Sequence, residues 1–142
     1  MGYTSIVVVN MLYQYIKHSE LMTSANRPKG TLCKYDRPLN SMTEDIVING
    51  LPLIKDDVDE AVLNVNIYVP NFVFPNNQAD KSQADTARLL VLSNLGNQAF
   101  KDGEEIWDET GEYCFKYQQD TVMPDKNNQH YLNFRIEFYS IN

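Results

Sequence analysis

The chain has only two cysteines and two histidines in 142 residues, so few side chains are available for nucleophilic or metal-dependent chemistry. Cys33 and Cys114 are too few and too far apart in sequence for a disulfide framework or a zinc site, and we expect free, reduced thiols. His18 falls in an expected helix and His130 opens an expected strand, and neither belongs to a catalytic motif. The sequence therefore indicates a protein that is not an enzyme and binds no metal or cofactor.

Long hydrophobic runs are also missing. A membrane-spanning helix needs about 20 apolar residues, and the apolar run at 6–9 has four, with no basic segment before it and polar residues soon after. We therefore expect a soluble, unexported protein with no membrane partner.

Basic residues are scarce: 12 Lys and Arg stand against 19 Asp and Glu, and the formal net charge is −7. Affinity for nucleic acid comes from clustered Lys and Arg, so we expect no specific nucleic-acid binding. The acidic residues concentrate at 56–60 and 104–112. Such runs are mostly solvated turns; the alternative is an acidic docking face or the lining of a passage for DNA.

Glycine-rich phosphate loops and dinucleotide fingerprints are absent as well. A metal-dependent nuclease needs separated carboxylates and a lysine, and Glu112 with Lys116 is the nearest approximation. A match of that kind is expected by chance in an acidic chain. The nuclease nevertheless remains the alternative from another class of function.

Two long segments alternate between apolar and polar residues, as strands with one buried face do. In 61–69 the inward residues are Leu63, Val65, Ile67 and Val69. In 130–139 the inward residues are Leu132, Phe134, Ile136 and Phe138. A third alternating stretch, 112–119, is followed by a turn at 124–128 that leads into the last strand. Shorter strands are expected at 31–35 and 45–49, and Asn49-Gly50 is compatible with a hairpin into an irregular, Pro52-containing partner at 51–54.

Helical spacing appears twice. The first helix covers 4–20, with Thr4 or Ser5 as its N-cap. Its apolar positions are Ile6, Val9, Leu12, Tyr13 and Ile16. The second runs from Ser82, as its cap, to about Phe100. Its apolar stripe is Ala84, Ala87, Val91 and Leu95, with Leu90 beside it. We expect one α+β domain over 1–142, with a mixed or mostly antiparallel sheet of about four to six strands packed by an N-terminal and a central helix.

Two loops are candidates for binding, at 23–30 and 70–83, because long loops without regular structure tend to be functional or disordered. The second carries Phe72 and Phe74. The alternative is that both rings fold back onto the core.

Four segments together resemble a known group of proteins. They are KYDRPLNSMTEDIVINGL at 34–51, VLNVNIYVPN at 62–71, DTARLL at 85–90 and HYLNFRIEF at 130–138. The sequence is similar to small proteins encoded among the head and tail genes of phages and prophages of Bacteroides-type bacteria. Its layout also resembles the tail-terminator and tail-completion (neck) families of long-tailed phages, over residues 4–140 or so.

The resemblance implies a structural virion protein without catalytic residues, whose copies form a homo-oligomeric ring that contacts the tail tube or the head connector. It also implies a location in the virion, and in the bacterial cytoplasm during assembly. The function of such families is geometric, so no single residue's role is carried over. From the loops and the outer strand faces we expect nine partner-contacting candidates: Arg27, Lys29, Tyr68, Phe72, Phe74, Asn76, Asn77, Tyr131 and Tyr139.

Three alternatives stay open for these residues. The outer strand faces can instead be covered by the protein's own helices. A head-completion or connector ring would serve the same fold. A monomeric adaptor that binds a host protein through Phe72 and Phe74 is the third.

Overall fold

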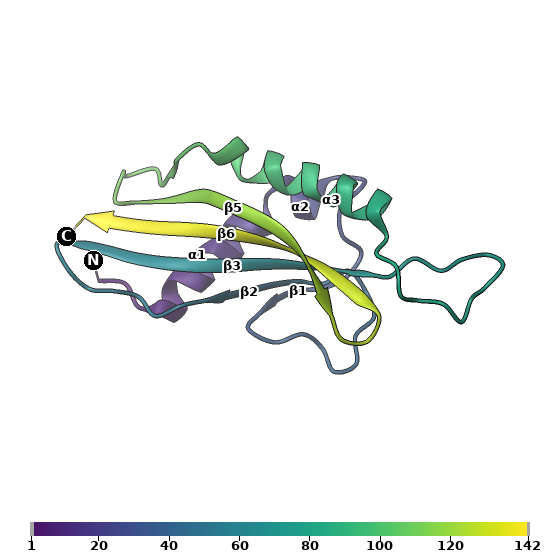
Figure 1. Cartoon of the computed structure of the whole chain (residues 1–142). Coiled ribbons are helices and arrows are strands. Elements are labelled where there is room, and N and C mark those ends of the chain that lie inside the picture. Colours follow the sequence, from purple (N-terminus) through teal and green to yellow (C-terminus); the bar gives the residue numbers. More distant parts are fainter. Residues whose placement is uncertain (1, 142) are drawn as a thin grey trace.

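Three antiparallel strands of thirteen residues form the centre of the fold in the computed structural model, which describes residues 2–141 (Figure 1). They are β3 (Val58–Pro70), β5 (Tyr113–Asp125) and β6 (Gln129–Ile141). β6 pairs with β3 along its whole length and with β5 on its other side. The inward residues expected in β3 and β6 are all buried, which confirms the strand prediction.

Short strands complete the sheet at both edges. β1 (Leu32–Lys34) pairs in parallel with β2 (Ile46–Gly50), which pairs antiparallel with β3. At the other edge β4 (Ile106–Trp107) pairs antiparallel with β5. The order is β1-β2-β3-β6-β5-β4, a mixed six-stranded sheet, and the α+β prediction is confirmed.

The hairpin expected at Asn49-Gly50 is wrong. Gly50 stays in β2, opposite Leu63, and the chain then makes a wide connection to β3. Leu51 still donates its N–H to the carbonyl of Val62, but Pro52 has no N–H to donate, and the next bridge to β3 is that of Ile54 with Glu60. The longer β3 is the partner of β2 because it offers a full antiparallel ladder.

The helices are α1 (Ser5–Lys17), the short α2 (Glu20–Thr23) and α3 (Thr86–Ala99), followed by the 3-10 turn η1 (Lys101–Gly103). The side chain of Thr4 caps α1, as expected. The expected apolar stripe of α1 needs correction, because Ile6 is exposed and Val8 is buried.

The predicted start of α3 is wrong. Asp85, not Ser82, is the N-cap, and its carboxylate accepts from the N–H of Arg88 at 3.1 Å. Ser82 instead donates its hydroxyl to Asp80 in a local turn. The stripe is therefore wrong too: Leu90 and Val91 are exposed, and the buried residues of α3 are Leu89, Leu92, Leu95, Gly96 and Ala99.

Both long helices pack on one face of the sheet and form a single core with it (Figure 1). We call this face the inner face. The opposite, outer face carries half-exposed side chains, among them Asn64, Tyr68 and Tyr131. The alternative that the protein's own helices cover these residues is therefore wrong.

Gly96 sets how closely α3 approaches the sheet. A Cβ at this position would lie 2.3 Å from the ring of Phe134, a side chain of β6 that is completely buried. Protein interiors are close-packed, so the ring has no free space to move into. Only glycine at position 96 allows this helix to sit on the Phe134 ring.

The β5–β6 hairpin ends in a three-residue turn, Lys126 to Asn128. Asn127 and Asn128 have positive φ angles of 63° and 59°, which asparagine tolerates better than most residues. The turn expected at 124–128 is confirmed, but β5 reaches Asp125, six residues beyond the expected strand end.

Replacing Gly96 with alanine tests this packing. In a helix interior, alanine is normally more favourable than glycine by about 1 kcal/mol. At position 96 we instead expect the free energy of unfolding to fall by about 1–3 kcal/mol, because the added methyl group overpacks the core. Urea unfolding measures the change. Asn94→Ala, on the exposed side of the same helix, is the control and should be neutral or slightly stabilising. A stabilised Gly96→Ala variant would contradict the packing argument.

Candidate functional site

Three loops meet at one end of the sheet, where β3 ends at Pro70 and β6 begins at Gln129. We call this the distal end. The loops are 24–31, 35–45 and 71–83. Together they line a surface hollow of about 510 Å³, whose walls include Lys29, Met42 and Phe72. The structure thus brings together two of the candidate regions that lie more than forty positions apart in sequence.

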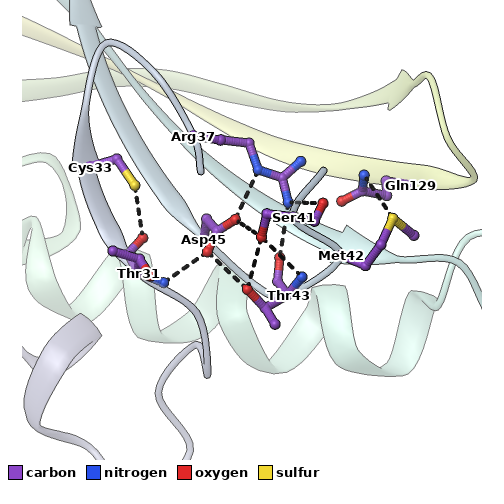
Figure 2. Close-up of polar contacts among 8 residues, drawn as sticks. All are labelled: Thr31, Cys33, Arg37, Ser41, Met42, Thr43, Asp45 and Gln129. Atoms are coloured by element: carbon purple, nitrogen blue, oxygen red, sulfur yellow. Dashed lines mark hydrogen bonds and ion pairs between the residues drawn. The ribbon is translucent and has the colours of Figure 1, made fainter. Parts of the chain in front are cut away.

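The 35–45 loop is organised around one carboxylate, that of Asp45 (Figure 2). Its side chain is completely buried and accepts four hydrogen bonds. Arg37 donates from Nε at 2.9 Å, and Ser41 and Thr43 donate from their hydroxyls at 2.5 and 2.9 Å. The backbone N–H of Thr31 donates the fourth at 2.8 Å. Each oxygen of this carboxylate therefore accepts two hydrogen bonds, and the guanidinium of Arg37 compensates the buried charge.

These hydrogen bonds fix the protonation state of Asp45. Burial alone raises the pKa of a carboxyl, but the bonds from Ser41, Thr31, Arg37 and Thr43 outweigh it and hold the pKa below its usual value. Asp45 is therefore ionised at neutral pH and remains an acceptor.

Arg37 also links the loop to the outer face of the sheet. Its guanidinium donates to the carbonyls of Ser41 and Thr43, and it lies 4.1 Å from the centre of the Tyr68 ring. The Tyr68 ring in turn lies beside the ring of Tyr131, tilted by 35°, with ring centres 5.1 Å apart. The candidates Tyr68 and Tyr131 therefore form a neighbouring pair, and the 35–45 loop partly covers it.

Gly30 permits the close approach of the first loop to this network. A Cβ there would lie 2.4 Å from Oδ1 of Asp45. Its N–H donates to the carbonyl of Glu44 at 3.0 Å, which joins the two loops directly.

A second ion pair attaches α3 to the same loops. Arg88 donates through Nε and Nη2 to the two oxygens of Glu44, at 2.7 and 2.8 Å. Burial raises the pKa of the Glu44 carboxyl, but the hydrogen bonds from Arg88 and from the N–H of Lys29 lower it by more than burial raises it. The net shift of the pKa is therefore downward. Arg88 also donates to the carbonyl of Arg27 at 3.0 Å. The backbones at Arg27 and Lys29 are thereby held, while both of these side chains remain exposed.

The 71–83 loop extends beyond the rest of the chain at the distal end (Figure 1). Its base is closed by hydrogen bonds from Phe72 N–H to Gln83 and from the Asn71 amide to Lys81. Phe72 and Phe74 pack on each other edge to face at 5.0 Å. Neither ring belongs to the hydrophobic core, so the alternative that they fold back onto it is wrong.

The candidates Asn76 and Asn77 lie at the exposed tip of this loop, where the N–H of Asn77 donates to the carbonyl of Phe74 at 3.2 Å. Tyr139 is the candidate that lies elsewhere. It sits near the opposite end of the sheet, and its hydroxyl donates to Glu137, which raises the pKa of the tyrosine to about 12. Eight of the nine candidates thus lie at or near the distal end.

Sequence reasoning missed the residues that hold this end together. Arg37, Ser41, Thr43 and Asp45 fall inside the 34–51 segment on which the resemblance was noted. No local pattern distinguishes them from an ordinary polar loop, because their pairing depends on the chain folding over the outer face of the sheet.

No protein-family profile matches the chain, and no curated protein matches it. Within residues 2–141, no three His, Cys, Asp or Glu side chains are grouped as around a metal ion. None of the helices in that range is both long enough and apolar enough to cross a membrane. Cys33 and Cys114 are free, as expected, and both are buried.

Acid pH tests the role of Asp45. Its folded-state pKa is depressed, so the stability it contributes is present above the usual pKa of about 4 and is lost as pH falls toward the folded-state pKa. Asp45→Asn should lower the free energy of unfolding by about 3 kcal/mol at pH 7, because Arg37 loses its buried partner. Urea unfolding at pH 7 and pH 3 should show the deficit shrinking in acid.

Asp36→Asn, an exposed neighbour in the same loop, is the matched control and should change little. A deficit for Asp45→Asn that is equally large at pH 3 would mean that the ionised carboxylate is not the stabilising species.

Proposed function

We propose that this chain is a structural virion or prophage protein that forms a ring at the end of the tail tube or at the head–tail junction. The observation that carries the proposal, beside the resemblance, is the unequal charge of the two ends of the sheet. Such a ring has two different faces, one toward the tube and one toward the connector, and its subunit needs two unlike ends.

The two acidic runs of the sequence meet at the end opposite the loops, which we call the acidic end. Cross-strand pairing puts Asp59 and Tyr113 on either side of Ser140 in the same row. Residues 51–60, 104–116 and 137–141 contain ten carboxylates and two lysines, a formal charge of −8. The rest of the chain, with nine carboxylates and ten basic residues, has a charge of +1. The entire net negative charge therefore lies at one end.

The ends also differ in the kind of contact they offer. The distal end presents the aromatic 71–83 loop and the basic side chains of Arg27 and Lys29. The acidic end presents carboxylates, which repel the phosphates of DNA and favour a basic protein surface. This asymmetry fits a subunit whose acidic end faces one neighbour or the DNA passage, and whose distal end faces another.

A closed ring forms through head-to-tail contacts between unlike surfaces of each subunit. The partners implied are further copies of this chain, tail-tube subunits and the head connector, in the virion and in the bacterial cytoplasm during assembly. A monomeric adaptor is the second candidate function, since the exposed Phe72 side chain offers a binding surface for a host protein.

The mass of the purified protein tests the proposal. Light scattering over a wide concentration series should give a discrete multiple of the 16.4 kDa subunit, and negative-stain images should show closed rings. Addition of purified tail tubes should place the rings at tube ends. A chain that stays monomeric at every concentration and ignores the tubes would contradict the proposal and favour the adaptor.

A further inference from the structure

One backbone edge of the sheet is open along half of β5. β4 covers β5 only at Cys114 and Phe115, and η1 lies close to Tyr117. From Gln119 to Met123 the only backbone partners of β5 among the described residues are in β6. A free strand edge is a template for another extended segment. The bulge at Tyr117/Gln119 and the proline at 124 limit its length to about five residues.

An apolar groove runs beside this edge, between β5 and α3. It has a volume of about 380 Å³, and its walls include Leu89, Leu90, Val122 and Leu132. Leu90 is 63% exposed and Val122 is 46% exposed, so the groove is open to solvent. Its one carboxylate, that of Asp120, accepts a hydrogen bond from the hydroxyl of Tyr117. The groove therefore suits an apolar segment without charge.

The same chain carries a segment of that chemistry. Residues 71–79 read NFVFPNNQA and contain no charged side chain. Phe72 and Val73 are 41% and 47% exposed, and the loop extends away from the body (Figure 1). Exposed apolar side chains such as those of Phe72 and Val73, with the half-buried Phe74 beside them, are costly in water unless another surface covers them.

We propose that residues 71–74 of one copy, which precede the turn closed by Asn77, dock along the free edge of β5 in the next copy, with Phe72 and Phe74 in the groove between β5 and α3. This inference rests on the proposed ring and names its subunit contact. The two surfaces are different, as a head-to-tail interface requires.

The position of the two surfaces supports a second copy as the occupant. Both surfaces lie toward the same end of the sheet. Pro70, which precedes the loop, lies in the row of Gln129, and Val122 of the groove lies in the row of Leu132, three positions further along β6.

Charge supports the same choice. Two copies with a net charge of −7 repel each other, so a self-contact is favoured where at least one of the two surfaces is uncharged. The loop segment 71–79 has no charged residue and the groove has one carboxylate, that of Asp120, so the contact brings no two like charges together.

Three variants test the contact by light scattering. The loop variant is Phe72→Ser with Phe74→Ser, and the groove variant is Leu90→Glu. Each should raise the concentration needed for assembly by about 30-fold or more, because aromatic and apolar anchors dominate interfaces. Leu39→Ser, at a residue 92% exposed in the 35–45 loop, removes a similar apolar side chain outside the contact and should leave assembly unchanged. Circular dichroism checks that all three fold.

Mixing the two defective variants gives the sharper test. The intact loop of the groove variant can enter the intact groove of the loop variant, after which no complete pair of surfaces remains. The mixture should therefore stop at a dimer of twice the 16.4 kDa subunit, whereas each variant alone stays monomeric.

The outcomes separate this inference from the proposed function. If both variants form the same rings as the wild type, the inference is overturned and the ring proposal stands. If both form rings but no longer sit on tail tubes, the loop is an axial contact and the inference is again overturned. If the wild type never associates, the subunit contact and the preformed ring fail together.

Discussion

The pairing of β3 with β6 over thirteen residues is the constraint on which the other features depend. It fixes which side chains of both strands face the helices, and so creates the inner face on which α1 and α3 pack. It also places the end of β3 beside the start of β6, which brings the 71–83 loop next to the tip of the β5–β6 hairpin. At its other end the same ladder brings the two acidic runs into one region. A slip of one residue would exchange the inner and outer faces, and the buried apolar rows of both strands prevent it.

Two carboxylates hold the elements of the distal end together. Asp45 and Glu44 are neighbours in sequence, but their side chains serve different elements: Asp45 holds the 35–45 loop, and Glu44 holds α3 through Arg88. Both are satisfied by several donors, so their charges are compensated where they lie. The net negative charge of the chain lies at the opposite end. This separation leaves one end of the molecule strongly negative and the rest of the chain nearly neutral.

Periodicity identified the long strands because burial of one face makes apolar and polar residues alternate in β3 and β6. It identified the central helix because apolar residues recur at helical spacing near residue 90. It failed where competing local bonds decided the outcome. Ser82 is a typical N-cap residue, but its hydroxyl donates a hydrogen bond to Asp80, and Asp85 caps the helix instead. The stripe of α3 was misassigned because the run Leu89–Leu92 places apolar residues on nearly every side of the helix, so that periodicity alone does not choose the buried side; Leu89 and Leu92 are buried, and Leu90 and Val91 are exposed. The network of Asp45 was beyond sequence reasoning, since its partners lie in a loop without periodicity. Composition alone indicated the 70–83 loop, but it left open whether Phe72 and Phe74 lie on its surface or fold back onto the core.

The turn of three residues between β5 and β6 sets an order for forming the sheet. The β5–β6 hairpin needs to close a loop of three residues, with asparagine accepting both positive φ angles, whereas the pairing of β3 with β6 encloses residues 71–128. Loop-closure entropy makes the longer closure costlier by roughly 2–3 kcal/mol. Loop-closure entropy therefore favours closing the hairpin before β3 joins it. Because the central ladder pairs segments far apart in sequence, we expect it to slow folding as well as to fix the final geometry.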